Sequence, residues 1–279
     1  GFMGDQAKRA GAEVLEGVRV NRVQVADHGV SVYSDGMDWQ GQVLVGADGA
    51  SSLVARTLGL AGEKKIAATL EQEMPLSTER LSQNRGVIKV DYGLVPAGYA
   101  WVFPKADHLS MGVGSLSPKM KDLRSLLGKV LEAEGLVDFS AQQSRGWFIP
   151  ISPEPGNLHG GRALVIGDAA GLADAFTGEG IYAALFSARL AAEVLIEQTN
   201  QARTDLRRYT SLVQEKMGPE LANAFRVTRW FHPVSGLVHR ILRRQQALAA
   251  NLIQVVAGNM TYAQFFDFFQ QQLRTAWHF

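Results

Sequence analysis

Two glycine-rich turns carry the backbone amides and side chains in this sequence that are best suited to chemistry. The first turn follows the apolar run Ala163–Ile166 and reads Gly167-Asp168-Ala169-Ala170-Gly171. A second glycine cluster, Thr177-Gly178-Glu179-Gly180, precedes residues 181–195, whose apolar positions have helical spacing. The free amides and the dipole of that helix N-terminus would attract an anionic or electron-rich ligand. Glycines at positions 178 and 180 would let a flat ligand lie directly on the backbone.

A strand, turn and helix pattern of the same kind occurs at residues 42–60. The apolar run Val43–Val45 ends at Gly46-Ala47-Asp48-Gly49, and Ser52 follows before a short helical segment. An ordinary strand–helix connection with a glycine-rich loop would explain either turn alone. Two such turns in one chain favour two strand ends that converge on one elongated ligand. Asp168, directly after an apolar strand, is better placed to bind hydroxyl groups than to act in acid–base catalysis.

The remaining side chains form no constellation that demands catalysis. The sequence has no cysteine, which excludes disulfides, thiolate metal sites and cysteine nucleophiles. Ser51 and Ser52 lie in no G-x-S-x-G elbow. The histidines have neither H-x-x-x-H nor H-E-x-x-H spacing, so we expect no metal site. The sequence therefore identifies no catalytic side chain.

Composition and charge are those of a globular protein. The 279 residues are 46% hydrophobic, which is ample for a core, and 28 basic residues nearly balance 27 acidic ones. This balance gives no electrostatic case for binding nucleic acid. We find no signal segment and no uninterrupted apolar run near the length of about 18 residues that indicates a spanning helix. With the absence of cysteine, these features favour a cytoplasmic location.

Residues 62–157 differ in character from the two turn regions. Short β-rich runs, separated by proline, glycine and polar breaks, surround one amphipathic helix at Leu123–Glu134. The runs are Ile66–Met74, Gly86–Tyr92, Tyr99–Phe103, Leu109–Gly114 and Gln142–Ile149. We expect an antiparallel sheet with one covering helix, inserted between the two halves of the domain that carries the turns.

An aromatic stripe lies within this insert. Strand alternation puts Tyr99, Trp101 and Phe103 on one face, and Gly112 and Gly114 occur in the following run. Three rings beside glycines that leave space would wall an apolar slot. The alternative interpretation is that the rings form the core of the sheet against its helix, because aromatic stripes in strands usually serve packing.

Residues 199–279 have helical spacing again. We expect helices at 203–217, at 220–244 with an interruption at His232-Pro233, at 245–257 and at 261–274. Arginines alternate with aromatic residues here: Arg226, Arg229, Arg240, Arg243 and Arg244 with Phe225, Trp230, Phe231, Phe265, Phe266, Phe268, Phe269 and Trp277. A packed helical cap with solvated arginines is the favoured interpretation, and peripheral contact with a membrane is the alternative.

The two turns and the aromatic stripe carry a family resemblance. From about Gly11 to Arg274, the chain resembles the geranylgeranyl reductases, a branch of the aromatic-ring hydroxylase-like superfamily of FAD-dependent flavoproteins. The run Tyr99-x-Trp101-x-Phe103-Pro104 with its following Gly-x-Gly is similar to one in the reductase branch, as is the Ser-x-Val-Ala-Arg form that ends at Arg56. One position departs from the family: Ala175 stands where proline is frequent, which makes the following loop less rigid.

The resemblance implies a set of contacts with FAD. Asp48 and Gly49 would lie near the pyrophosphate, and Gly167 and Asp168 would bind the ribityl or ribose hydroxyls. The backbone of Gly178, Gly180 and Ile181 would lie near the pyrimidine edge of the flavin, where a helix N-terminus stabilises negative charge on the reduced ring. Val20 would make a backbone contact to the adenine; the alternative is that it is a core residue of the hairpin.

The implied fold is mixed α/β. It combines a partial Rossmann-like FAD-binding domain (residues 1–61 and 158–198), an inserted antiparallel-sheet substrate domain (62–157) and a C-terminal helical region (199–279). In this superfamily a G-x-G-x-x-G turn after the first strand binds the ADP half of FAD. The sequence contains no such turn, so we expect a chain without its N-terminal nucleotide-binding unit; the alternative is a relative that never had one.

The implied activity is FAD-dependent reduction of isolated C=C bonds in a prenyl lipid of the geranylgeranyl type. NADPH or ferredoxin would supply the electrons. The slot at Tyr99, Trp101, Phe103, Gly112 and Gly114 would hold the apolar chain of the substrate. Two alternatives remain: a flavin monooxygenase or halogenase on the same fold, and a non-catalytic lipid-binding fragment.

Overall fold

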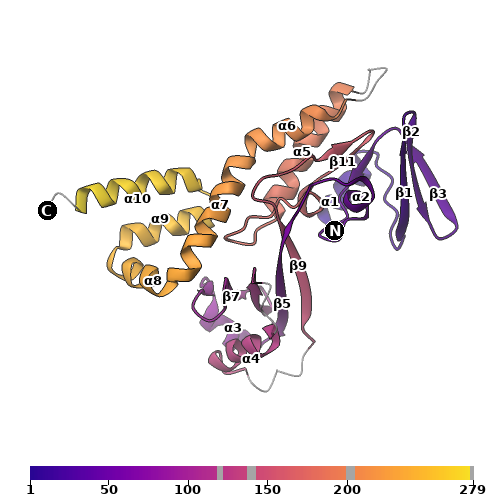
Figure 1. Cartoon of the computed structure of the whole chain (residues 1–279). Coiled ribbons are helices and arrows are strands. Elements are labelled where there is room, and N and C mark those ends of the chain that lie inside the picture. The colour runs from indigo at the N-terminus through magenta and orange to yellow at the C-terminus, as the bar shows by residue number, and fades with distance from the viewer. Residues whose placement is uncertain (118–121, 137–142, 199–204, 277–279) are drawn as a thin grey trace.

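The computed structural model describes residues 1–117, 122–136, 143–198 and 205–276. Figure 1 shows a mixed α/β core with a three-stranded sheet at one end, a second sheet with its own helices, and a group of C-terminal helices. The predicted mixed α/β class is confirmed.

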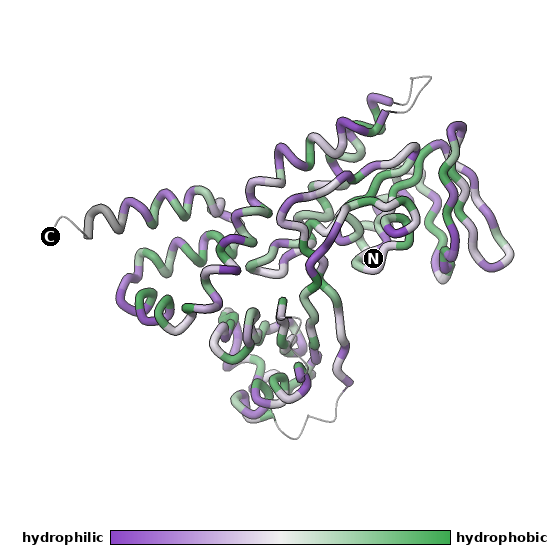
Figure 2. The backbone as a smooth tube through the Cα atoms, in the orientation of Figure 1, coloured by the Kyte–Doolittle hydropathy of each residue, from purple (hydrophilic) through white to green (hydrophobic). Residues whose placement is uncertain are grey.

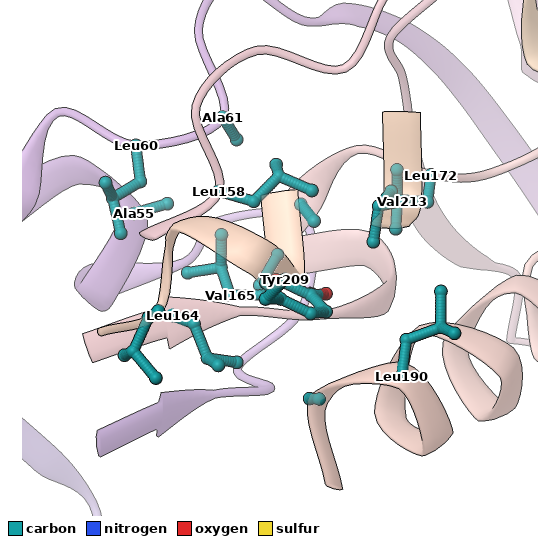
Figure 3. Close-up of a cluster of buried hydrophobic side chains, with 14 of the residues drawn as sticks. Ala55, Leu60, Ala61, Leu158, Leu164, Val165, Leu172, Leu190, Tyr209 and Val213 are labelled. Carbon is teal, nitrogen blue, oxygen red and sulfur yellow. Dashed lines mark hydrogen bonds between the residues drawn. The ribbon is translucent and has the colours of Figure 1, made fainter. Parts of the chain in front are cut away.

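The core is built on a small sheet in the order β10-β11-β4. Its strands are β4 (Leu44–Gly46), β10 (His159–Gly160) and β11 (Ala163–Val165), and its helices are α2 (Leu53–Leu58), η2 (Gly167–Ala170), α5 (Ile181–Gln198) and α6 (Arg207–Lys216). Every residue of β11 is buried, as expected for a strand covered on both faces. Tyr209 of α6 lies within this core, and its hydroxyl donates to the carbonyl of Val165 at 2.9 Å (Figure 3).

An antiparallel three-stranded sheet packs on one side of the core. It contains β1 (Val20–Ala26), β2 (Gly29–Ser34) and β3 (Met37–Gly41) and follows α1 (Phe2–Arg9), which has no buried residue. Val23 alternates inward and joins the apolar cluster of the core. The guanidinium of Arg162 donates to the carbonyl of Asp27 at 2.7 Å, which fixes this sheet to the β10–β11 turn.

The insert forms a five-stranded antiparallel sheet in the order β6-β7-β8-β5-β9. The strands are β5 (Lys65–Pro75), β6 (Lys89–Asp91), β7 (Gly98–Pro104), β8 (His108–Ser115) and β9 (Arg145–Ile151), and the helices are α3 (Thr78–Asn84) and α4 (Leu123–Ala133). Helix α4 packs on one face through Leu127, Val130 and Leu131, which confirms the predicted covering helix. Helix α3 was not predicted, although Ser77 caps its N-terminus by accepting a hydrogen bond from the amide of Arg80. The predicted run from Gln142 begins outside the described residues.

The C-terminal helices are amphipathic. They are α7 (Gly218–Phe231), η3 (His232–Val234), α8 (Ser235–Arg244), α9 (Gln246–Val256) and α10 (Tyr262–Ala276). Hydrophilic and hydrophobic residues alternate along them in Figure 2, and their apolar sides meet in a cluster with Ala67, Ala173 and Ala175. The predicted interruption at His232-Pro233 is confirmed, because a short 3-10 turn separates α7 from α8. Trp277 lies outside the described residues.

Candidate functional site

Parallel pairing of β4 and β11 brings the two glycine-rich turns together. Leu44 pairs with Ala163 and Gly46 with Val165, and the amide of Ile166 donates to the carbonyl of Gly46 at 3.0 Å. Both strands therefore end at the same edge, the place where open α/β sheets bind ligands. The predicted convergence of two strand ends is confirmed.

The carboxylate of Asp48 stabilises the N-terminus of helix α2. It accepts hydrogen bonds from the hydroxyl of Ser52 at 2.5 Å and from the amides of Leu53 and Val54 at 2.6 and 3.2 Å. Burial raises the pKa of Asp48, but these hydrogen bonds outweigh burial and leave the pKa below its ordinary value. Gly49 has a positive φ of 73° with open space beside it, so its backbone is accessible to a ligand. The contact of both residues with a pyrophosphate stays a prediction.

The Gly167-Asp168 turn packs tightly against helix α5. The amide of Gly167 donates to the hydroxyl of Ser187 at 3.0 Å, and a β-carbon at Gly167 would lie 2.9 Å from that of Ala184. Gly167 therefore serves the close approach of turn and helix, and the structure gives its amide a protein partner. The carboxylate of Asp168 lies beside Gly180, where a β-carbon would be 3.1 Å from Oδ1. Burial raises the pKa of Asp168, Lys64 opposes this shift, and Glu179 adds to it.

Lys64 is a site residue that the sequence did not reveal. Its ammonium donates to the carbonyl of Ala169 at the end of η2. Burial lowers the pKa of Lys64, while the charges of Asp48 and Asp168 raise it. The lysine thus shares the edge of the sheet with both carboxylates. In the sequence it stands in the run Glu63-Lys64-Lys65, which has the pattern of solvated charges, and its partner is 105 residues away.

The second glycine cluster lies between the turn and the inserted sheet. Gly178 has a φ of 70°, and a β-carbon there would lie 3.2 Å from the hydroxyl oxygen of Tyr99. That hydroxyl donates to the carbonyl of Thr177. Among the hydrogen bonds of the described residues, none is donated by the amides of Gly180 and Ile181. Ile181 begins α5 and is 76% exposed, so the first turn of this helix lies at the surface, where amides without an intrahelical partner can bind a ligand.

The aromatic stripe faces a cavity. Along β7, the alternate residues Ala100 and Val102 are buried in the cluster beneath α4, while Tyr99, Trp101 and Phe103 line a cavity of about 510 Å³ on the opposite face. The interpretation of the rings as packing against the helix is therefore wrong. We call this cavity the slot, and its role in binding a substrate stays a prediction. Gly178 and Phe176 line the same cavity, so the slot reaches the glycine cluster.

The glycines of β8 make room for an indole. Trp101 pairs with Gly112, and a β-carbon at Gly112 would lie 2.2 Å from Cζ2 of Trp101. The space predicted for substrate at Gly112 is thus filled by the ring of Trp101, whereas Gly114 lines the open cavity. The indole N–H donates to the hydroxyl of Ser110 at 3.3 Å, and that hydroxyl donates to the carboxylate of Glu71 at 2.5 Å. These two consecutive hydrogen bonds fix the orientation of the Trp101 ring, which lines the slot.

The cavity changes in polarity along its length. Tyr99, Phe176 and Ile149 surround the end at Gly178. The far end is lined by the charged or polar side chains of Glu71, Glu73, Lys105, His108 and Ser110. A ligand with an apolar chain and a polar head matches this distribution when its chain points toward Gly178.

Val20 lies apart from the residues described so far. It is the first residue of β1, with an exposed side chain, in the sheet that packs beside the core. It pairs with Ser34 at the strand end, and its contact to an adenine stays a prediction.

Comparison with known sequences identifies relatives of the chain. It is 28% identical over 231 residues to an uncharacterized protein of Methanosarcina barkeri (83% of this chain, 59% of that protein) and 29% identical over 245 residues to a geranylgeranyl diphosphate reductase of Synechocystis sp. (78% and 58%). A digeranylgeranylglycerophospholipid reductase 2 of Methanosphaera stadtmanae is 27% identical over 229 residues (77% and 58%). No protein-family model matches the chain. The chain spans less than two thirds of the length of these relatives.

Comparison with solved structures identifies the fold. A geranylgeranyl bacteriochlorophyll reductase-like protein of Thermoplasma acidophilum has a TM-score of 0.65 at 21% identity, with coverage of 82% of this chain and 61% of that one. Klebsiella pneumoniae HpxO, complexed with FAD and uric acid, has a TM-score of 0.66 at 18% identity (95% and 70%). The flavin-dependent halogenase CmlS has a TM-score of 0.57 at 17% identity (79% and 43%). By sequence the chain is similar to proteins named as geranylgeranyl diphosphate and digeranylgeranylglycerophospholipid reductases, and it shares the fold of the Thermoplasma acidophilum protein and of HpxO.

Proposed function

We propose that this chain is the substrate-binding and flavin-facing part of an FAD-dependent oxidoreductase that reduces isolated C=C bonds in a prenyl lipid. The observation that carries the proposal is the aromatic slot, because it reaches the glycine cluster that would face the flavin. A prenyl chain offers only apolar surface, and the walls formed by Tyr99, Trp101 and Phe103 bury such a surface. The relatives named as reductases of geranylgeranyl and digeranylgeranyl compounds support the same reading.

The residues at the edge of the small sheet fit FAD. The open amides of Gly180 and Ile181 suit the electron-rich edge of a ring, and the carboxylate of Asp168 beside them suits hydroxyl groups. Lys64 adds positive charge on the side of Asp48. These residues would hold the cofactor, and bound reduced flavin would supply the hydride for the double bond.

The side chains of this pocket would orient the substrate and exclude water from it, rather than transfer a proton. Trp101, held by Ser110 and Glu71, would keep the chain of the substrate in one plane. Burial, and then the charge of Asp174, raise the pKa of Tyr99 to about 12, and its proton is already donated to the carbonyl of Thr177. Tyr99 is therefore a poor proton donor, and we assign the proton to solvent. NADPH or ferredoxin as the source of electrons stays a prediction.

Two alternatives on this fold differ in what the flavin does. A monooxygenase or halogenase would react with oxygen, and flavin-dependent halogenases are among the similar folds. A lipid-binding fragment would hold the chain without turnover. The aromatic slot favours the reductase, because three aromatic rings on one face give a flexible apolar chain a surface to pack against.

A single set of assays tests the proposed function. FAD is titrated into the protein, and the protein with reduced FAD is then mixed with a geranylgeranyl lipid in the absence of oxygen. We expect binding of FAD and a product two mass units heavier for each bond reduced. In a parallel assay in air, oxygen consumption that depends on substrate would support the monooxygenase instead. Lipid binding without a product in either assay would support the lipid-binding fragment.

We also propose peripheral contact with a membrane through the end of α7 and α8. In the described part of the chain, no helix has the length and hydropathy required to cross a bilayer. Trp230 and Leu237 are 79% and 53% exposed, and no residue of α8 is buried. The sequence carries five arginines and no acidic residue between Glu220 and Asp267. An apolar surface among cations suits an anionic bilayer, and His232, which lies between these helices, also lines the slot.

Reversing two of these charges is expected to release the protein from anionic vesicles. Each basic residue near such a surface contributes about 1 kcal/mol, so R243E/R244E should weaken binding at least about tenfold. The measurement is co-sedimentation with phosphatidylcholine vesicles, with and without phosphatidylglycerol. The double variant R9E/R19E, made at two other exposed arginines, is the matched control. An equal loss of vesicle binding in the control, or binding that is the same with and without phosphatidylglycerol, would contradict the proposed membrane contact.

A further inference from the structure

The loop that carries the second glycine cluster separates two cavities. Ala175, Phe176 and Gly178 line the aromatic slot. The other residues of this loop, Asp174, Thr177 and Glu179, line a second cavity of about 590 Å³ that also touches α7, α9 and α10. The backbone of this loop therefore lies between the two cavities, and residues on both sides contact it.

Asp174 organises the loop from within. Its Oδ1 atom accepts hydrogen bonds from the amides of Phe176 and Thr177, both at 2.8 Å. Its backbone carbonyl accepts from the amide of Gly178 at 2.9 Å, and its amide donates to the carbonyl of Glu179 at 2.8 Å. These four bonds close residues 174–179 into one turn, directly before the open amides of Gly180 and Ile181.

Tyr262 ties this turn to the C-terminal helices. Its hydroxyl donates to the carboxylate of Asp174, at 3.0 Å from Oδ1 and 2.9 Å from Oδ2, although the two residues are 88 positions apart. Its amide donates to the carboxylate of Glu220 in α7 at 2.8 Å, which fixes the start of α10. The ring is 6% exposed and meets Phe176 edge to face at a centroid distance of 6.3 Å.

We propose that Tyr262 is a positioning residue for the flavin, which acts through Asp174 on the amides of Gly180 and Ile181. The inference rests on the proposed function, because it assigns these amides to the cofactor. Tyr99 holds the opposite side of the same turn through the carbonyl of Thr177. The C-terminal helices thus contribute to the geometry of the cofactor site through one hydroxyl, without touching the cofactor.

Both tyrosines remain hydrogen-bond donors over the ordinary pH range. Burial, and then the charge of Asp174, raise the pKa of Tyr262 far above its usual value and that of Tyr99 to about 12. The hydroxyl of Tyr262 therefore keeps its proton and donates it in a hydrogen bond to the carboxylate of Asp174, at a largely buried position. Such charge-assisted hydrogen bonds hold geometry more firmly than neutral ones do.

Amide exchange and FAD titration of the full chain test the inference together. The variants are Y262F and D174A, D174N as the conservative replacement, and Y33F, whose hydroxyl bonds to Gln24 in the distant β1–β2 hairpin, as the control. Loss of a hydrogen bond to a charged group should speed exchange in residues 174–181 about tenfold or more in Y262F and D174A. D174N, which keeps the acceptor for the two amides, should retain most of the protection.

The FAD arm separates the inference from the proposed function. We expect Y262F to raise the dissociation constant of FAD about tenfold and to alter the visible flavin spectrum, with both unchanged in Y33F. Unchanged exchange in Y262F, or faster exchange without an effect on FAD, would overturn the inference. Absence of FAD binding in every variant and in the unaltered chain would instead refute the proposed function, while exchange would still show whether Tyr262 holds the loop.

Discussion

Replacing Gly98 by alanine is expected to destabilise the five-stranded sheet by about 3 kcal/mol, near the upper end of the range for overpacking. A β-carbon at Gly98 would lie 1.8 Å from the carbonyl oxygen of Gly114 and 2.9 Å from the α-carbon of Ser115. These are backbone atoms of the neighbouring strand β8, so no side chain can rotate to relieve the clash. The strands must separate where Tyr99 begins the slot.

Urea denaturation followed by circular dichroism measures this effect. The matched control is G128A, because Gly128 is inside helix α4 with open space around its added β-carbon. Alanine at this exposed helical position should stabilise the protein by about 0.5–1 kcal/mol. Equal denaturation midpoints for G98A and the unaltered protein would show that the two strands are not in close contact at this position.

Replacing Asp168 by alanine is expected to weaken FAD binding by about 10- to 100-fold. That range corresponds to one or two lost hydrogen bonds between a carboxylate and hydroxyl groups. Because burial raises the pKa of Asp168, affinity in the unaltered protein should fall as pH decreases through that raised value, where the carboxylate gains a proton. The measurement is quenching of flavin fluorescence between pH 5 and pH 8.

The effect of Asp168 on binding can be separated from its effect on folding. A raised pKa means that the folded chain favours the protonated form, so the ionised carboxylate lowers stability at neutral pH and contributes no such penalty at acidic pH. D168N should therefore leave the unfolding midpoint at pH 7 unchanged or higher. Asp38, on an exposed strand far from the turn, provides the control D38A. Equal FAD affinity in D168A and D38A would contradict the role assigned to this carboxylate.

Features that depend on neighbouring residues were predictable from the sequence. The alternation along Tyr99–Phe103 placed the three rings on one face of β7, and the His232-Pro233 pair predicted the break between α7 and α8. The convergence of the two turns followed from their shared pattern of strand, turn and helix, because carboxyl ends of parallel strands meet at one edge.

Features that depend on distant contacts were not predictable. Lys64 and Tyr262 reach partners 105 and 88 residues away, and nothing in their local sequence marks them. Alternation could not decide whether the rings of β7 face a helix or a cavity, because both faces carry apolar residues. The ring of Trp101 fills the space over Gly112 for a related reason: the cross-strand register that pairs them is set by the whole sheet.

Strand β7 gives the slot a definite reach. Alternate residues of a strand are about 6.8 Å apart, so the face from Tyr99 to Phe103 extends about 14 Å from the glycine cluster. With the polar head held at the charged end, a double bond about 14 Å along an extended chain would lie beside Gly178, and the rest of a longer chain would pass beyond it. Under the proposed function, the distance between the charged end and the glycine cluster would therefore select the double bond that is reduced, and the head would have to shift before a bond at another distance could react.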